Sequence, residues 1–138
     1  MGLRGTVDRI GLGVPSIKAA ALFFFDDALA IIPLGVVRGP GFRANKKSRA
    51  AVTDLSGRTN LTPDQVQEEW NDSVMLSLSD IDSAELRKAM QGRMFGTLDL
   101  RFDVTGGRTQ AMLAHRSAKD PLKNLLGSLL GERFKDRT

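Results

Sequence analysis

The segment Ala20–Gly35, with the sequence AALFFFDDALAIIPLG, most restricts how this chain can fold. It is the most apolar stretch of the sequence, and Asp26 and Asp27 divide it. A membrane-spanning helix needs about 20 consecutive, mostly apolar residues, and each half is only about half that long. A signal peptide would place its apolar region close behind a basic N-terminus, whereas about twenty mixed residues precede this one. The segment is therefore predicted to form a β-hairpin, Ala20 to Phe25 and Ala28 to Pro33, that turns at the two aspartates.

Length and composition limit the number of domains and the kinds of chemistry. The chain has 138 residues, 41% of them hydrophobic, which suits one domain, 1–138, with a core of its own. Residues 1–18 contain several glycines and a proline, so an irregular or short helical extension is expected there. The absence of cysteine excludes disulfides and thiol enzymes and suits the cytoplasm. A net charge of +4 permits anionic partners without selecting one.

One helix start is well marked in the segment LTPDQVQEEWND. Thr62 is a natural N-cap, Pro63 fits the first helical position, and Gln65 completes a capping box. These signals predict a short inserted helix near residues 63–72. Before this helix, Val36–Arg49 is predicted to be a loop, because glycine, proline and basic residues are mixed there. The next segment, 50–60, is predicted to be a strand.

The second half of the chain alternates between apolar and polar residues before a closing helix. Thr97–Val104 has the clearest two-residue period, and 74–88 and 108–114 are also predicted to be strands. Apolar residues then recur at spacings of three and four, which predicts an amphipathic helix over Leu122–Phe134 with Asp120 as its cap. We expect three leucines of this helix to be almost fully buried against the sheet: Leu125, Leu126 and Leu129.

The order of these elements resembles that of the bacterial pleckstrin-homology-like (PH-like or GRAM-like) domains. The resemblance rests on ALFFFDDALAIIPLG, LTPDQV, VMLSLSDIDSAELRK, GTLDLRFDVTGGRTQAML and the closing helix, and it covers about residues 20–135. It implies an α+β fold in which bent antiparallel sheets form a barrel or sandwich, capped by the C-terminal helix. It also implies a non-enzymatic docking module. Some members bind phosphoinositides at the first hairpin turn, but Asp26 and Asp27 would repel a phosphate here.

The residues that could carry catalysis or bind a metal do not form a recognisable motif. His115 is the sole histidine, which excludes a two-histidine metal site. Asp80, Asp82 and Glu85 lack the further ligands and the glycine of an EF-hand loop. The segment GLGVPS, residues 11–16, lacks the third glycine of a dinucleotide-binding loop. We therefore assign no catalytic, cofactor-binding or metal-binding residue and expect no enzyme activity.

A basic cluster is the remaining candidate site. Between Arg38 and Arg58 there are six basic residues and one acidic residue, a local net charge of +5. The cluster is interpreted either as a solvated loop or as a contact surface for an anionic partner. Nucleic acid ranks below protein or membrane, because the cluster offers only Phe42 for stacking on bases. The residues assigned to this surface are Arg43, Lys46, Lys47 and Arg49.

Two functional hypotheses follow for a cytoplasmic protein of this kind. The preferred one is an interaction module that docks to protein partners or self-assembles through the unpaired edges of its sheets. The alternative is a peripheral binder of anionic membranes that uses the basic cluster.

Overall fold

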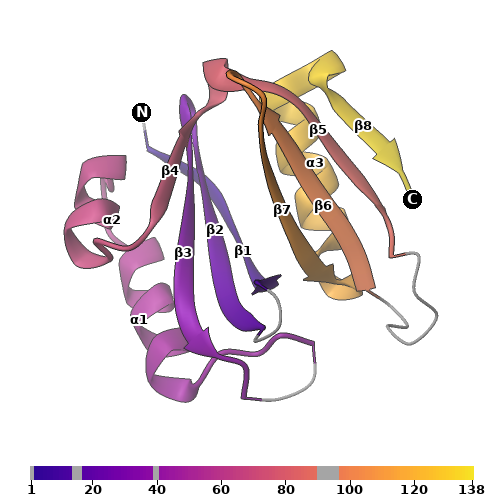
Figure 1. The fold of residues 1–138 in the computed structure, drawn as a ribbon. Helices are drawn as coiled ribbons and strands as arrows, with labels where there is room; N and C mark the ends of the chain where they lie inside the picture. The colour runs from indigo at the N-terminus through magenta and orange to yellow at the C-terminus, as the bar shows by residue number, and fades with distance from the viewer. Residues whose placement is uncertain (1, 14–16, 39–40, 90–96) are drawn as a thin grey trace.

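The computed structural model describes residues 2–13, 17–38, 41–89 and 97–138. It has an α+β fold, as predicted, built from one large sheet and three helices (Figure 1). The strands are β1 (Leu3–Leu12), β2 (Lys18–Phe25), β3 (Ala28–Val36), β4 (Val74–Ser77), β5 (Ile81–Lys88), β6 (Thr97–Val104), β7 (Arg108–His115) and β8 (Phe134–Arg137). The helices are α1 (Lys46–Ser56), α2 (Pro63–Glu69) and α3 (Lys119–Leu130), with short 3-10 turns η1 (Leu78–Asp80), η2 (Arg116–Ala118) and η3 (Gly131–Arg133).

The strands of the described residues form a single sheet in the order β4-β3-β2-β1-β7-β6-β5-β8. Neighbouring strands are antiparallel, except that β8 runs parallel to β5. The sheet has two halves, because β1 and β7 pair only at Ile10–Ala114 and Gly11–Leu113. Figure 1 shows the halves diverging from this short junction, while the β4–β5 connection crosses between them at the other end. Since β4 and β8 are the ends of the strand order, the sheet is open and does not close into a barrel.

The inner core lies between the two halves of the sheet and α3. Leu22 and Phe24 from β2, Phe102 from β6 and Leu126 from α3 all belong to it, and none is more than 1% exposed. Burying a leucine or phenylalanine side chain stabilises a fold by about 1.5 to 3 kcal/mol before chain entropy is subtracted. The closing helix therefore docks on the sheet, as its apolar repeat predicted.

The β2–β3 hairpin is buried on both faces, which explains its unbroken apolar sequence. Alternate side chains, such as Phe23 and Ile32, point away from the inner core and form an outer core. Leu55 of α1 and Val66 of α2 cover this outer core and are fully buried. The predicted turn at Asp26 and Asp27 is confirmed, with both aspartates exposed between β2 and β3.

The capping box of α2 forms as predicted. The Thr62 hydroxyl accepts the backbone N–H of Gln65 at 3.3 Å, and the Gln65 side-chain oxygen accepts the backbone N–H of Thr62 at 3.0 Å. Leu61 precedes the cap and packs in the same outer core as Val66. These local signals fix both the start of α2 and the side that it buries.

The end of the chain differs from the predicted helix over Leu122–Phe134. Helix α3 begins at Lys119 after Ala118, so Asp120 lies in its first turn and is not the cap. It ends at Leu130, because Gly131 adopts a non-helical conformation with a positive φ of 57°, which favours glycine, and Phe134 begins β8. Of the three leucines expected to be buried, Leu126 is buried, whereas Leu125 and Leu129 are only half-buried.

The prediction of an irregular or short helical extension over residues 1–18 was wrong for residues 3–12, which form β1, a central strand of the sheet. It pairs with β2 along most of its length and with β7 at its end. A bulge between Val7 and Ile10 places two residues between these inward-facing side chains, so the two-residue period is broken. Without that period, the sequence of β1 does not indicate a strand.

The prediction of a strand over residues 50–60 was also wrong, because this segment contains most of α1. The Asn45 side chain caps the helix by accepting the backbone N–H of Ser48 at 2.8 Å. The Ser48 hydroxyl in turn donates to the carbonyl oxygen of Leu34 at 3.3 Å, which holds the start of α1 against the end of β3. Only Leu55 of this helix is fully buried, so its sequence has no apolar stripe typical of a helix.

Candidate functional site

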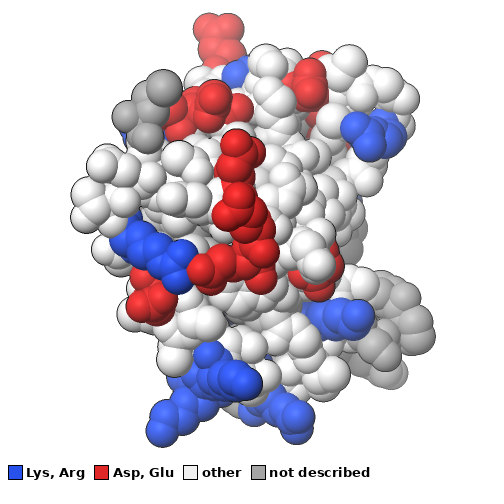
Figure 2. Space-filling view, turned by 90° about the vertical axis from the view of Figure 1, so that its left-hand side faces the viewer, with Lys and Arg blue, Asp and Glu red and all other residues white. Residues whose placement is uncertain are grey.

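The four basic residues assigned from the sequence lie at the start of α1. Arg43 precedes the helix, Lys46 and Lys47 are its first two residues, and Arg49 also lies in its first turn. All four side chains are exposed. Figure 2 views the side of the molecule that carries α1 and α2, and it shows Lys and Arg side chains gathered at the lower end of this face. The structure thus brings the predicted cluster together, but on a helix and not on an irregular loop.

A groove of about 300 Å³ lies beside this cluster, between β1, the end of β3 and α1. Three arginines line it: Arg9 from β1, Arg43, and Arg49 from α1. Lys46 and Lys47 are not part of the lining. The other lining residues are Asp8, Leu34, Phe42, Ala44, Val52 and Thr53. The groove therefore combines an apolar floor with a mainly basic rim.

Arg9 is held at the groove wall by the bulge in β1. Its backbone has a φ of 61°, and its Nε donates a hydrogen bond to the carbonyl oxygen of Gly41 at 3.1 Å. Gly41 itself has a φ of 71°, and a Cβ there would collide with the Arg9 guanidinium. Phe42, next in the chain, also has a positive φ, of 61°. Such conformations cost about 1 to 3 kcal/mol each in a residue other than glycine and are concentrated at functional sites.

The cations at the start of α1 lack internal acidic partners. Among the described residues, no ion pair involves Arg43, Lys46, Lys47 or Arg49. The first turn of α1 contains no acidic residue either. Because the N-terminus of a helix carries partial positive charge, basic residues there are unfavourable unless an anion lies nearby. This end of the molecule is therefore suited to an external anion.

Arg58, at the other end of α1, is in a different environment. Its guanidinium pairs with Glu69 of α2 at 2.6 Å and with Asp54 at 3.3 Å. The hydrogen bonds to Glu69 and then Asp54 raise the pKa of Arg58 above its ordinary value. This arginine therefore links the two helices and is not part of the candidate site.

Acidic residues gather next to the basic end. Helix α2 carries Asp64, Glu68 and Glu69, and Asp72 follows it. Figure 2 shows acidic side chains across the middle and top of the same face, above the basic end. Charge separated in this way orients an approaching anionic partner toward α1 and away from α2.

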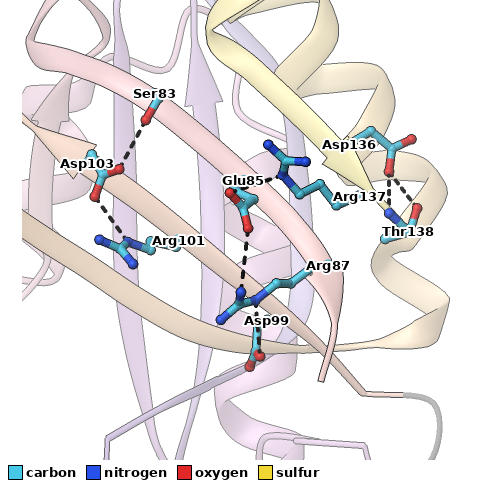
Figure 3. A network of polar contacts seen from close by, with 9 residues as sticks. All are labelled: Ser83, Glu85, Arg87, Asp99, Arg101, Asp103, Asp136, Arg137 and Thr138. Carbon is cyan, nitrogen blue, oxygen red and sulfur yellow. Dashed lines mark hydrogen bonds and ion pairs between the residues drawn. The ribbon is translucent and has the colours of Figure 1, made fainter. Parts of the chain in front are cut away.

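The exposed face of β5, β6 and β8 carries a second set of charges, but these are paired with each other (Figure 3). Asp103 accepts hydrogen bonds from Arg101 and from Ser83, both at 3.1 Å, and the bond from Arg101 is the main cause of its lowered pKa. Glu85 lies 3.4 Å from Arg137 and 3.8 Å from Arg87. Pairs of this kind, within one strand or between neighbouring strands, stabilise a sheet surface and leave little charge for a ligand.

Asp136, also shown in Figure 3, links β8 to its surroundings. It accepts hydrogen bonds from the Thr138 hydroxyl and backbone N–H, and it pairs with Lys123 of α3 at 3.0 Å. These interactions lower the pKa of Asp136 to about 2. In the part of the chain that the structure describes, no group of three or more carboxylate or imidazole side chains could hold a metal ion.

His115 lies at the end of β7, beside Gly41. Its Nδ1 accepts the backbone N–H of Ser117 at 3.2 Å and lies 2.8 Å from the Ser117 hydroxyl. Burial, followed by the positive charges of Arg9 and Arg116, lowers the pKa of His115 below its ordinary value of 6.5. Folding therefore favours the neutral imidazole relative to the unfolded chain.

We expect this histidine to make stability depend on pH. The unfolded chain binds a proton near pH 6.5, before the folded protein does, so the stabilisation is complete above that pH and is lost as the pH falls below it. The free energy of unfolding should thus decrease between about pH 7.5 and pH 5.5, a range in which carboxylates change little. Urea unfolding of the wild type and of His115→Gln checks this, since the variant should lose the dependence. Equal slopes for the two proteins would contradict it.

Comparison with known proteins gives information on the fold but not on the function. Neither a protein-family model nor a curated protein matches the sequence. Among solved structures, the C-terminal domain of an unknown protein from Leishmania infantum is similar, with a TM-score of 0.51 and 12% sequence identity. The match covers 93% of this chain and 83% of that domain. Almost the whole α+β arrangement therefore has a structural counterpart, while the identity is too low to transfer a function.

Sequence reasoning found part of this site and missed the rest. Charge alone identified Arg43 and Arg49, which line the groove, and Lys46 and Lys47, which lie outside it. Arg9 was missed because it reaches the groove only when β1 is placed beside α1. The glycine at position 41 was the one local signal of an unusual backbone nearby.

Proposed function

We propose that this protein is a non-enzymatic PH-like docking domain that binds a partner protein at its basic end. The observation that carries the proposal is the set of four exposed cations that have no acidic partner among the described residues. They lie beside a groove with an apolar floor, and Arg43 and Arg49 help to line it. The PH-like assignment is supported by the division of the sheet into two halves, which are antiparallel apart from the pairing of β8 with β5. It is also supported by the packing of α3 on the inner core.

The shape of the basic end favours a protein partner over a membrane surface. A flat bilayer cannot fill a groove, and its charge would also repel the acidic residues of α2 on the same face. Four cations near an anionic bilayer contribute about 1 kcal/mol each, which corresponds to a dissociation constant of about 1 mM when summed. No helix of the described residues is long and apolar enough to cross a membrane.

Docking through the edges of the sheet has less support than docking at the basic end. Strand β4 has only four residues, and β8 has three charged residues among its four. Short, charged edge strands resist the addition of another strand. Val74, in β4, is 41% exposed, but an isolated exposed valine is common on protein surfaces.

Two probes test the proposed docking surface: a fluorescein-labelled, glutamate-rich peptide, followed by anisotropy, and vesicles of phosphatidylcholine with phosphatidylserine, followed by co-sedimentation. We expect the peptide to bind the wild type and to bind more weakly as salt rises, since screening acts over about 8 Å at physiological ionic strength. Reversal of the four charges should abolish this binding. The reversed residues are Arg43→Glu, Lys46→Glu, Lys47→Glu and Arg49→Glu.

A control variant separates the basic end from net charge. It reverses four basic residues in the other half of the molecule and should keep the binding of the wild type: Lys88→Glu, Arg108→Glu, Lys119→Glu and Lys135→Glu. Circular dichroism confirms that both variants fold. Equal peptide binding by the wild type and the first variant would exclude the basic end as the contact. Vesicle binding that depends on the four residues, without peptide binding, would favour the membrane alternative.

A further inference from the structure

We propose that the groove beside α1 binds the carboxyl-terminal residue of a peptide, and that this residue has an apolar side chain. This inference rests on the proposed docking function and names the chemical group that the groove selects. A volume of about 300 Å³ is at the lower limit of ligand pockets, so it accommodates one residue and not an extended segment.

The arginines of the rim provide the contact for the carboxylate. Arg43 and Arg49 come from two sides of the groove, the segment before α1 and the helix itself, and neither forms an ion pair among the described residues. A guanidinium group donates two parallel hydrogen bonds to a carboxylate, which gives both strength and orientation. Arg9 adds a third positive charge at a fixed position, because its Nε is bonded to Gly41.

Asp8 distinguishes a peptide end from a phosphate group. Its carboxylate lines the same groove and is exposed. It would repel a doubly charged phosphate more strongly than a singly charged carboxylate, and it can accept a hydrogen bond from the backbone N–H of a peptide. A terminal residue presents both a carboxylate and such an N–H, so it matches the two signs of charge in the lining.

The apolar floor of the groove is the reason for proposing an apolar side chain on the bound terminal residue, and this floor is formed without a ligand. Phe42 is only 8% exposed, and its ring lies over Gly11 of β1, where a Cβ would come within 2.7 Å of the ring. Val52 of α1 also lines the groove and is half-buried. A floor that needs no rearrangement lowers the entropic cost of binding. A free phosphate or a polar sugar would leave this floor without a partner.

The test uses small probes and NMR titration of the labelled protein. N-acetylphenylalanine carries the carboxylate, the N–H and the apolar side chain, and N-acetylphenylalanine amide lacks only the charge. We expect the acid to shift the amide signals of groove residues and the uncharged amide to bind at least about tenfold more weakly, because the charged hydrogen bonds are lost. Inorganic phosphate should also bind more weakly than the acid.

Two variants with the same change in net charge separate the groove from its surroundings. Arg43→Gln with Arg49→Gln should weaken binding of N-acetylphenylalanine at least tenfold, roughly the effect of losing one charged hydrogen bond. Lys46→Gln with Lys47→Gln, outside the lining, should leave it nearly unchanged. Equal loss in both variants, or tighter binding of phosphate than of the acid, would overturn the proposal. Binding of the glutamate-rich peptide without binding of N-acetylphenylalanine would reject the groove ligand alone, and binding of neither would reject the docking function as well.

Discussion

Replacement of Leu126 by alanine is expected to lower the free energy of unfolding by about 2 to 5 kcal/mol. Leu126 is 1% exposed and lies in the inner core, together with residues from both halves of the sheet. Alanine would remove the contacts of the isobutyl group and leave a cavity that the two halves cannot easily close. For a domain of this size, this loss is a large part of the total stability.

Urea unfolding followed by circular dichroism measures this loss, and a neighbouring leucine provides the control. Leu129 lies on the same helix but is only half-buried, so Leu129→Ala should cost clearly less than Leu126→Ala. An equal loss in both variants would show that the helix contributes mainly through its backbone and not through the inner core.

Replacement of Phe23 by alanine is expected to cost about 3 to 5 kcal/mol, because this residue is fully buried in the outer core. Its ring belongs to the cluster that also contains Leu55 of α1 and Val66 of α2. The substitution therefore weakens the contact of both helices with the sheet. Trp70, the only tryptophan, packs partly buried against this core, so its fluorescence reports the outer core directly.

Two optical signals show whether the outer core unfolds together with the sheet. We expect tryptophan fluorescence and far-ultraviolet circular dichroism of Phe23→Ala to change at one urea concentration, lower than that of the wild type. Val36→Ala is the control, since Val36 is 62% exposed and its loss should change stability by no more than about 0.5 kcal/mol. A wild-type midpoint for Phe23→Ala would contradict the assignment of Phe23 to a packed core.

The elements that sequence reasoning predicted correctly have strong local signals. The two-residue period of β6 is visible in the sequence because alternate residues face the inner core and the solvent. The α2 helix was found because its capping box needs only residues three apart. The β2–β3 hairpin was found because its turn residues interrupt an otherwise unbroken apolar run. In each case, the information that defines the element lies within a few residues.

The elements that were missed depend on long-range contacts. In β1 the bulge at Arg9 shifts the inward-facing positions, so a strand in the middle of the sheet lacks a regular period. In α1 only Leu55 is fully buried, and packing on the hairpin stabilises a helix that its own pattern hardly indicates. Phe134 continues the helical spacing of α3 but joins β8, because Gly131 ends the helix and β5 provides a partner strand. The groove was not predicted for the same reason, since β1 and α1 form its walls.

The burial of the β2–β3 hairpin on both faces also has a consequence before the protein is folded. Six- or seven-residue apolar segments with high β-propensity and no charge favour intermolecular stacking when they are exposed. Lys18–Phe25 and Ala28–Val36 are covered only after α1, α2 and α3 have docked on the sheet, and α3 is made last of these. Until then, Lys18 at the start of the first strand and the two aspartates between the strands are the charges that oppose such stacking. We therefore expect Asp26 and Asp27 to oppose aggregation of the newly made chain, in addition to forming the turn of the folded protein.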